Sequence, residues 1–138
     1  MSQTKREEFW NTLTHFIGIV LSLIGLPLLI FANNNLSSFS LASILFFEFG
    51  LLFVYISSTL YHYVENVELK KKLRTLDHIS IFYLIAGSYA PICLITLYND
   101  SGIGVFVAVL AIMFIGTFFK LFYTGKHEKF SLFLYLAM

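Results

Sequence analysis

Charged residues are scarce in this chain. Asp, Glu, Lys and Arg make up 12% of the 138 residues, whereas 58% are hydrophobic, and the mean hydropathy is +0.80. A soluble domain carries about 25% charged residues, so the composition excludes that class of protein. The net charge of +1 offers no basic surface to a nucleic acid, and we expect no nucleic-acid partner.

Cysteine is nearly absent as well. The one cysteine, Cys93, lies within an apolar run, so no disulfide can form within a single chain. Cys93 is best explained as a small apolar side chain in a helix interior. The sequence also lacks a nucleotide-binding fingerprint, a phosphate-binding loop and a nucleophile elbow.

Long apolar runs are what the chain does contain. A helix of about 20 residues crosses about 30 Å of hydrocarbon. Four runs reach that length: Leu13–Ala32, Phe39–Val64, Ile79–Tyr98 and Ile103–Tyr123. A fifth run begins at Phe130 and is too short to cross as a helix. We therefore predict an all-α, multi-pass membrane protein. Residues 1–138 would form one integral membrane domain, with four complete spans and the start of a fifth, incomplete at its C-terminus.

Basic residues are concentrated at alternate ends of these runs. They precede the first run, lie between the second and third and follow the fourth, whereas the loops 33–38 and 99–102 contain none. Because Lys and Arg mark cytoplasmic loops, the pattern predicts a cytoplasmic N-terminus. It also places His15, His62 and Asp77 near the cytoplasmic face.

Polar side chains on the expected helices stand out, because an ionisable group at the centre of a membrane helix costs roughly 2–4 kcal/mol. Glu8, Asn11 and His15 are spaced three and four residues apart, so they share one helical face. Ser58 and His62 share a face of the second helix. Such groups face the protein interior rather than lipid, and we expect the polar faces of three helices to converge.

Two interpretations of this polar group stay open. Neutral imidazole is a preferred zinc ligand, and Asp77, predicted to open the third helix at the depth of His62, could hold a zinc-bound water and accept its proton. Ser58 could orient the ligand or the water. The alternative is that the histidines, His15 above all, are hydrogen-bonded structural residues.

Two further ionisable residues fit the site less well. His78 points about 100° away from Asp77 around the helix, so it is expected at the interface or in support of the site. Glu48 lies about 21 Å from His62 along the second helix, which is too far to join the same site.

Three segments together resemble the hemolysin III family, the bacterial branch of the progestin and adipoQ receptor group, which is related to the alkaline ceramidases. The segments are Glu8-x-x-Asn11-x-x-x-His15, Ser57-Ser58-Thr59-Leu60-Tyr61-His62, and Leu76-Asp77-His78 leading to Ile85-Ala86-Gly87-Ser88-Tyr89-Ala90-Pro91. The similarity covers essentially the whole chain.

The resemblance implies a seven-helix bundle in the cell membrane, of which this chain is a fragment, with a cytoplasmic N-terminus. It also implies a zinc ion near the cytoplasmic side, with His62 as a ligand, Asp77 holding the zinc-bound water and Ser58 in support. Two further histidine ligands would come from an H-x-x-x-H motif on the seventh helix, which this sequence does not contain. The structural or ligand-supporting residues would be Glu8, Asn11, His15 and His78.

Three functions follow from the resemblance and stay open. The first is a zinc-dependent hydrolase that cleaves an amide or ester of a membrane lipid, although this chain alone, without the further histidines, is expected to be inactive. The second is a membrane-perturbing cytolysin or pore former, which the polar faces support poorly because they are polar mainly at one end. The third is a non-enzymatic sensor in membrane lipid homeostasis. Membrane lipids are the expected partners in each case.

Overall fold

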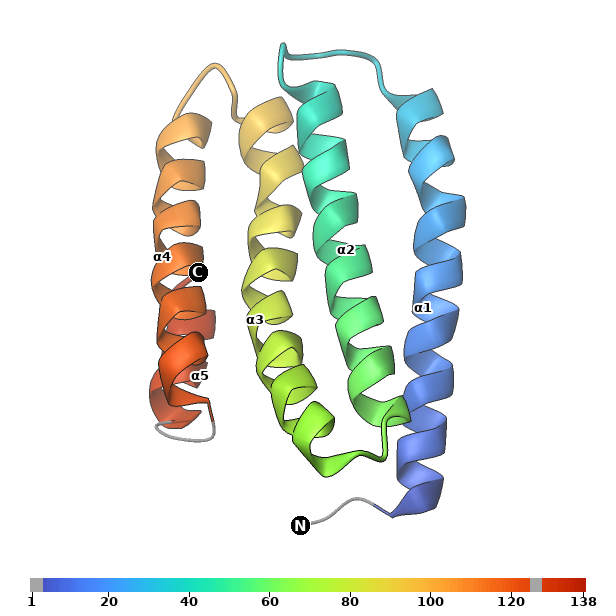
Figure 1. The fold of residues 1–138 in the computed structure, drawn as a ribbon. Helices are drawn as coiled ribbons and strands as arrows, with labels where there is room; N and C mark the ends of the chain where they lie inside the picture. Colours follow the sequence, from blue (N-terminus) through green and yellow to red (C-terminus); the bar gives the residue numbers. More distant parts are fainter. Residues whose placement is uncertain (1–3, 125–127) are drawn as a thin grey trace.

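The computed structural model describes residues 4–124 and 128–138, and these residues form helices connected by short loops (Figure 1). The helical elements, in chain order, are α1 (Lys5–Ala32), α2 (Ser40–Tyr63), α3 (Val67–Pro91), the π-helical turn η1 (Ile92–Thr96), α4 (Gly102–Tyr123) and α5 (Glu128–Ala137). No strand occurs within the described residues, so the all-α prediction is confirmed.

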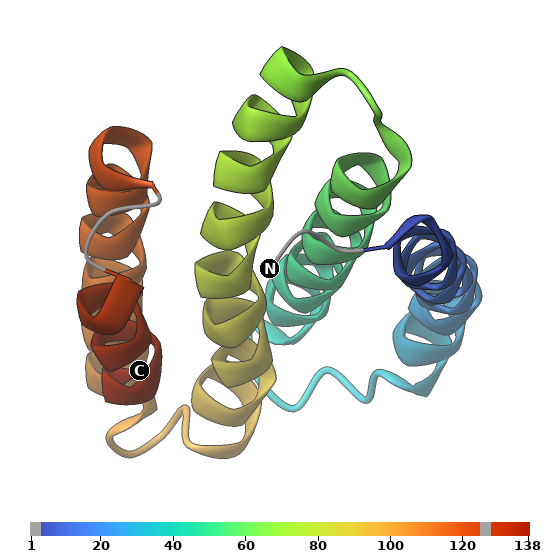
Figure 2. The same ribbon diagram turned by 90° about the horizontal axis from the view of Figure 1, so that it is seen from below.

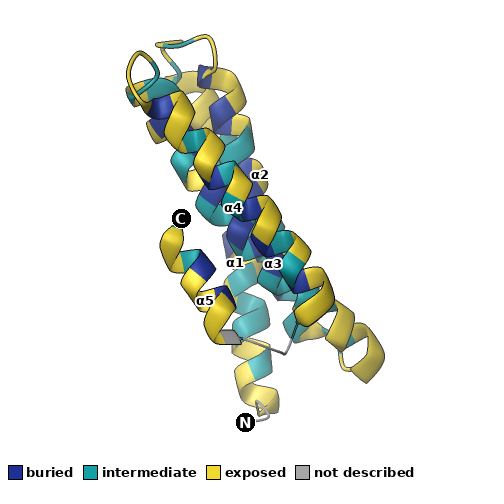
Figure 3. Cartoon of the chain, turned by 90° about the vertical axis from the view of Figure 1, so that its left-hand side faces the viewer, coloured by how far each residue is buried: buried dark blue, intermediate teal, exposed yellow. Residues whose placement is uncertain are grey.

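Among the described residues, four helices are long and apolar enough to cross a membrane. They are α1, α2, α3 continued through η1, and α4, and α5 is a shorter helix of 10 residues. Large apolar side chains remain exposed along these helices, for example Phe31 at 92% and Phe118 at 65%. Figure 3 shows the same pattern, with buried residues in strips between helices and exposed residues over the outer faces. Such a surface suits a lipid environment.

The first and third helices begin earlier than the apolar runs do. At the start of α1, the Thr4 hydroxyl accepts a hydrogen bond from the Glu7 amide at 3.3 Å, and the Glu7 carboxylate accepts one from the Thr4 amide at 2.7 Å. At the start of α3, the Asn66 side chain accepts a hydrogen bond from the Leu69 amide at 3.0 Å. Hydropathy marks the lipid-crossing part of a helix, whereas these caps set where the helix starts.

Because α3 begins before the third apolar run, Asp77 has a different position in the helix from the predicted one. It lies ten residues inside α3, which begins at Val67, so the prediction that Asp77 opens the third helix is wrong. Residues 68–76 are Glu, Leu, Lys, Arg and Thr, most of which favour helix, and they extend α3 beyond the apolar run.

Helix α2 lies between α1 and α3, as the view along the bundle shows (Figure 2). Within the described residues, α1 and α3 each pack on α2, whereas the backbones of α1 and α3 do not approach one another closely. The backbones of α2 and α3 approach closely at Gly50, where an added Cβ would lie 2.7 Å from the Tyr83 carbonyl oxygen. Small residues permit such approaches between membrane helices.

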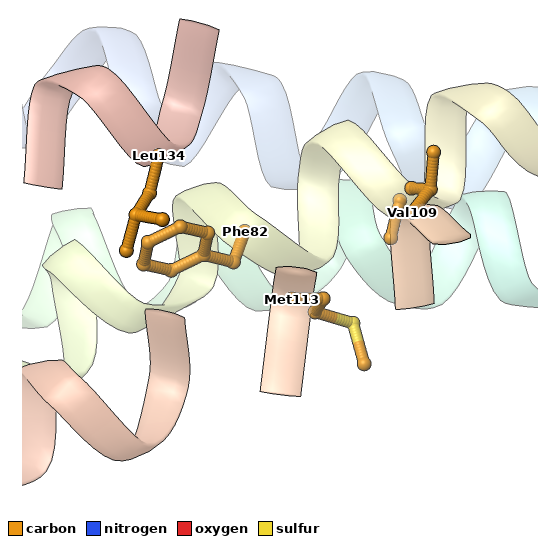
Figure 4. Close-up of a cluster of buried hydrophobic side chains, with 5 residues drawn as sticks. Phe82, Val109, Met113 and Leu134 are labelled. Atoms are coloured by element: carbon orange, nitrogen blue, oxygen red, sulfur yellow. The ribbon is translucent and has the colours of Figure 1, made fainter. Parts of the chain in front are cut away.

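A second packing centre joins α3, α4 and α5 (Figure 4). It consists of the buried apolar residues Phe82, Ala86, Val109, Met113 and Leu134. Since α4 and α5 contact α3 here, the face of α3 that carries Phe82 is directed away from α1.

Candidate functional site

Polar side chains of three helices gather at one end of the bundle, where α1 begins, α2 ends and α3 begins. We name this end the basic end, because Lys5, Arg6 and the residues Lys70–Arg74 lie there. The side chains, named here the polar cluster, are Glu8 and His15 of α1, Ser58 and His62 of α2, and Asp77 of α3. The contacts of the cluster divide into one set around Glu8 of α1, which reaches α2 and α3, and another set between α2 and α3.

The first set centres on the carboxylate of Glu8. Its Oε2 atom lies 2.8 Å from Nδ1 of His62, and its Oε1 atom accepts a hydrogen bond from Nζ of Lys70 at 2.7 Å. The His62 side chain is only 10% exposed. A carboxylate can only accept, so the proton of this hydrogen bond belongs to Nδ1, and in the neutral ring Nε2 keeps its lone pair.

The second set joins α2 to α3. The buried Ser58 hydroxyl donates a short hydrogen bond to Oδ1 of Asp77. Ser57, the residue before it, donates to the Ser80 hydroxyl at 2.9 Å. Two adjacent serines therefore hold two α3 residues that are three positions apart, which fixes α3 relative to the basic end of α2.

His15 joins the polar cluster through ring contacts. Its imidazole stacks on that of His62, with centroids 5.7 Å apart and the planes 6° from parallel, and it lies 6.2 Å from the Tyr55 ring. In the described part of the chain it makes no hydrogen bond. The stack fixes the plane of the His62 ring from the side of α1.

Among the described residues, the side chains of Asn11 and His78 make no hydrogen bond to the polar cluster. The Asn11 side chain has no hydrogen-bond partner among the described residues. Nδ1 of His78 donates to the Arg74 carbonyl oxygen at 2.8 Å, and it lies 3.9 Å from Oδ2 of Asp77. The His78 carbonyl oxygen accepts a hydrogen bond from the Tyr135 hydroxyl at 2.8 Å, so His78 links α3 to α5.

Two lysines have positions that sequence reasoning missed. Lys70, one of the basic residues between the second and third apolar runs, lies in α3, pairs with Glu8 and is stacked over the Tyr61 ring at 5.2 Å. Lys120, in the last turn of α4, is 1% exposed, although a lysine near the end of a membrane helix commonly extends to the interface. The opposite charges of Glu8 and Lys70 could have indicated the first pair. No local signal indicates the burial of Lys120.

A groove of about 770 Å³ opens beside His62 between α1 and α2. Its apolar wall includes Phe9, Leu13 and Phe16 of α1, and Lys5 and Lys70 are among its charged residues. Phe9 and Phe16 are 61% and 53% exposed, so the groove is continuous with the apolar outer face of α1. An apolar chain lying along α1 could therefore extend to His62.

The fit of a zinc ion can be tested on these contacts. A catalytic zinc site takes three protein ligands and a water. Across residues 4–124 and 128–138, no three side chains of His, Cys, Asp or Glu are grouped so that they could hold a metal ion. The polar cluster offers Nε2 of His62, while Nδ1 of that ring is bound to Glu8 and Oδ1 of Asp77 to Ser58. The described residues therefore do not form a complete zinc site.

The fold and the polar cluster define a class of protein: a multi-pass membrane protein with ionisable side chains gathered at one end of its helical bundle. The family model described as Haemolysin-III related matches residues 3–138. The chain therefore belongs to the hemolysin III family, as its motifs predicted.

Curated relatives agree with this assignment. The chain is 38% identical, over 136 residues, to the hemolysin-3 homolog of Bacillus subtilis (strain 168), an alignment that covers 98% of this chain and 64% of the relative. It is 32% identical, over 139 aligned positions, to hemolysin-3 of Bacillus cereus, with coverage of 100% and 64%. The chain thus spans a little under two thirds of the length of these relatives. No solved structure matches the chain significantly.

Proposed function

We propose that the polar cluster is the reaction centre of a membrane hydrolase that cleaves an amide or ester bond of a lipid. The observation that carries this proposal is the pairing of His62 with Glu8 and of Ser58 with Asp77 beside an apolar groove. Ionisable groups in a membrane bundle are costly, and they are generally retained for function. The groove offers a place for an acyl chain next to these groups.

The chemistry can be assigned to the groups of the chain. Asp77, with Oδ1 held by Ser58, has Oδ2 available to accept a proton from a water that attacks the lipid carbonyl carbon. The bond from that carbon to the amine or alcohol then breaks, and Asp77 returns the proton to the leaving amine or alcohol. His62 presents the lone pair of Nε2 towards the site, because Glu8 holds the proton at Nδ1. Positioned acid–base groups of this kind contribute typically 10²–10⁴-fold to a rate.

Zinc is a separate part of the proposal. The family resemblance implies that the whole protein holds zinc through His62 and further ligands outside the described residues. A carboxylate on the second nitrogen of a ligating histidine is the usual support for such a ligand, and Glu8 has that position. Bound zinc would lower the pKa of its water to about 7.

The location of the site is also proposed. The distribution of Lys and Arg supports a cytoplasmic basic end, and the resemblance supports the plasma membrane. A lipid of the inner leaflet would then approach His62 through the groove.

The test is hydrolysis of a fluorescent lipid amide by the protein, expressed from its complete reading frame and reconstituted in vesicles. We expect D77N and H62A to lower the rate at least about 100-fold. E68Q, which alters an acid at the basic end whose side chain is 81% exposed, should stay within about twofold of the unaltered protein, since Glu68 is outside the polar cluster. Bound zinc should fall in H62A and persist in E68Q.

Lipid cleavage that is unchanged in both D77N and H62A would refute the proposal. Release of an encapsulated dye from the same vesicles without lipid cleavage would support membrane perturbation instead, the activity suggested by the name of the two relatives.

A further inference from the structure

Glu48 is a buried acid that the polar cluster does not use. It lies in α2, about 21 Å from His62 along the helix. The residue is 3% exposed, and its Oε1 atom is buried without a hydrogen-bond partner in the described part of the chain. Buried polar groups are nearly always hydrogen-bonded, because leaving one without a partner is unfavourable, so an unpartnered buried carboxyl is unusual.

Glu48 is one of the residues that line a cavity of about 560 Å³ between α1 and α2, and this cavity is open on one side. Small residues of α1, namely Gly18, Ser22 and Gly25, form part of its wall, opposite Glu48 and Tyr55 of α2. No atom lies within 4 Å of the position that a Cβ on Gly25 would take, which shows how open the wall is there. The volume lies within the range of small-molecule sites, about 300–1,000 Å³.

The charges of the residues that line the cavity indicate the charge of the ligand it could bind. The residues that line the cavity include one acid, Glu48, and no base, and most of the others are apolar. An anionic ligand would meet no basic side chain among these residues, whereas a cation would meet both the carboxyl of Glu48 and the aromatic ring of Tyr55.

We propose that this cavity binds a lipophilic primary amine. An isolated carboxyl in an apolar wall takes up a proton rather than remaining charged. The incoming neutral amine accepts that proton: the O–H bond of Glu48 breaks, an N–H bond forms, and a carboxylate and an ammonium group are left in contact. No net charge enters the bundle, and the buried carboxyl gains a charged partner.

The position of the cavity agrees with an amphiphilic ligand. The cavity extends to Leu29 and Ala32, at the end of α1 opposite the basic end. Glu48 lies eight residues from the start of α2, about 12 Å below that same end of the bundle. An alkyl amine could enter there, and its site is separate from the proposed hydrolase centre.

The experiment compares three probes of equal length, hexylamine, hexanol and hexanoate, in thermal unfolding of the purified full-length protein in detergent. We expect hexylamine at about ten times its dissociation constant to raise the Tm by about 4 °C. Hexanol and hexanoate should leave it unchanged. An equal rise with hexanol would show apolar filling of the cavity alone and would overturn the proposal, as would the absence of any rise with hexylamine.

Two variants locate the site. E48Q keeps the size of the side chain but cannot transfer a proton to an amine, and G25L fills the open wall without altering Glu48. Both should abolish the effect of hexylamine, whereas E68Q, which alters an exposed acid at the basic end, should keep it. If E48Q does not fold, G25L still tests whether hexylamine binds in this cavity. A full hexylamine shift in G25L or in a folded E48Q would refute the site.

Discussion

At the scale of single residues, the carboxylate of Glu8 organises the polar cluster. It accepts hydrogen bonds from His62 and Lys70, which belong to two different helices, while its own side chain is 22% exposed. Exposed ion pairs contribute little to stability, but a partly buried acid that satisfies two donors leaves both without a partner when it is removed. Glu8 is therefore a structural link as well as the partner that sets the proton position on His62.

E8A should lower the free energy of unfolding by about 2 kcal/mol, because Nδ1 of His62 and Nζ of Lys70 both lose their acceptor. The measurement is reversible unfolding in mixed micelles. The matched control is E68A, which removes an ion pair between side chains that are 69% and 81% exposed and should cost less than about 0.5 kcal/mol. If E8A and E68A lowered the free energy of unfolding equally, the contacts of Glu8 would stabilise the protein no more than an exposed ion pair does.

At the scale of the elements, the approach of α2 to α3 holds the polar cluster together. Apolar surface gives no net preference for another helix over lipid, so close backbone packing and hydrogen bonds between helices decide the association. Gly50 permits the approach in the middle of α2, and the hydrogen bonds of Ser57 and Ser58 fix it near the basic end. The position of Asp77 beside α2 depends on both.

G50A should destabilise the protein by about 1–3 kcal/mol, because the added Cβ would lie 2.7 Å from the Tyr83 carbonyl oxygen and force the two backbones apart. G104A is the control: this helical glycine has no atom within 4 Å of an added Cβ, so its replacement should be neutral or slightly stabilising. Thermal unfolding in one detergent compares the two directly. A G50A variant as stable as G104A would contradict the packing described here.

At the scale of the whole molecule, the distribution of charge predicts how the bundle is inserted. The basic end contains most of the Lys and Arg residues, whereas the loops 33–38 and 99–102 at the other end contain none. Short loops rich in Lys and Arg remain in the cytoplasm. The polar cluster would then lie at the inner leaflet, and the Glu48 cavity would open towards the outer one.

Cysteine labelling tests this orientation. Cys93 is buried and can be replaced to give a C93S background. Added to it, S38C should react with a membrane-impermeant maleimide in intact cells, and E68C should react only after permeabilisation. The opposite pattern would place the polar cluster at the outer leaflet and would contradict the proposed cytoplasmic N-terminus.

The helices and the choice of polar residues could be predicted from sequence because both depend on local information. The length of each apolar run predicts a span, and spacing of three and four residues places Ser58 and His62 on one face. The contacts could not be predicted in this way. The pairing of Glu8 with His62 depends on where α1 begins, and that start is set by the Thr4 cap rather than by hydropathy.

The amino-acid sequence by itself determined the class of this protein, its membrane helices and its family, because composition, run length and motif spacing are properties of neighbouring residues. The tertiary structure alone decided that α2 separates α1 from α3, that Lys120 is buried and that Glu48 faces a cavity. These features depend on how each helix is rotated about its axis against its neighbours. In lipid, that rotation is selected by a few close contacts between residues far apart in the chain.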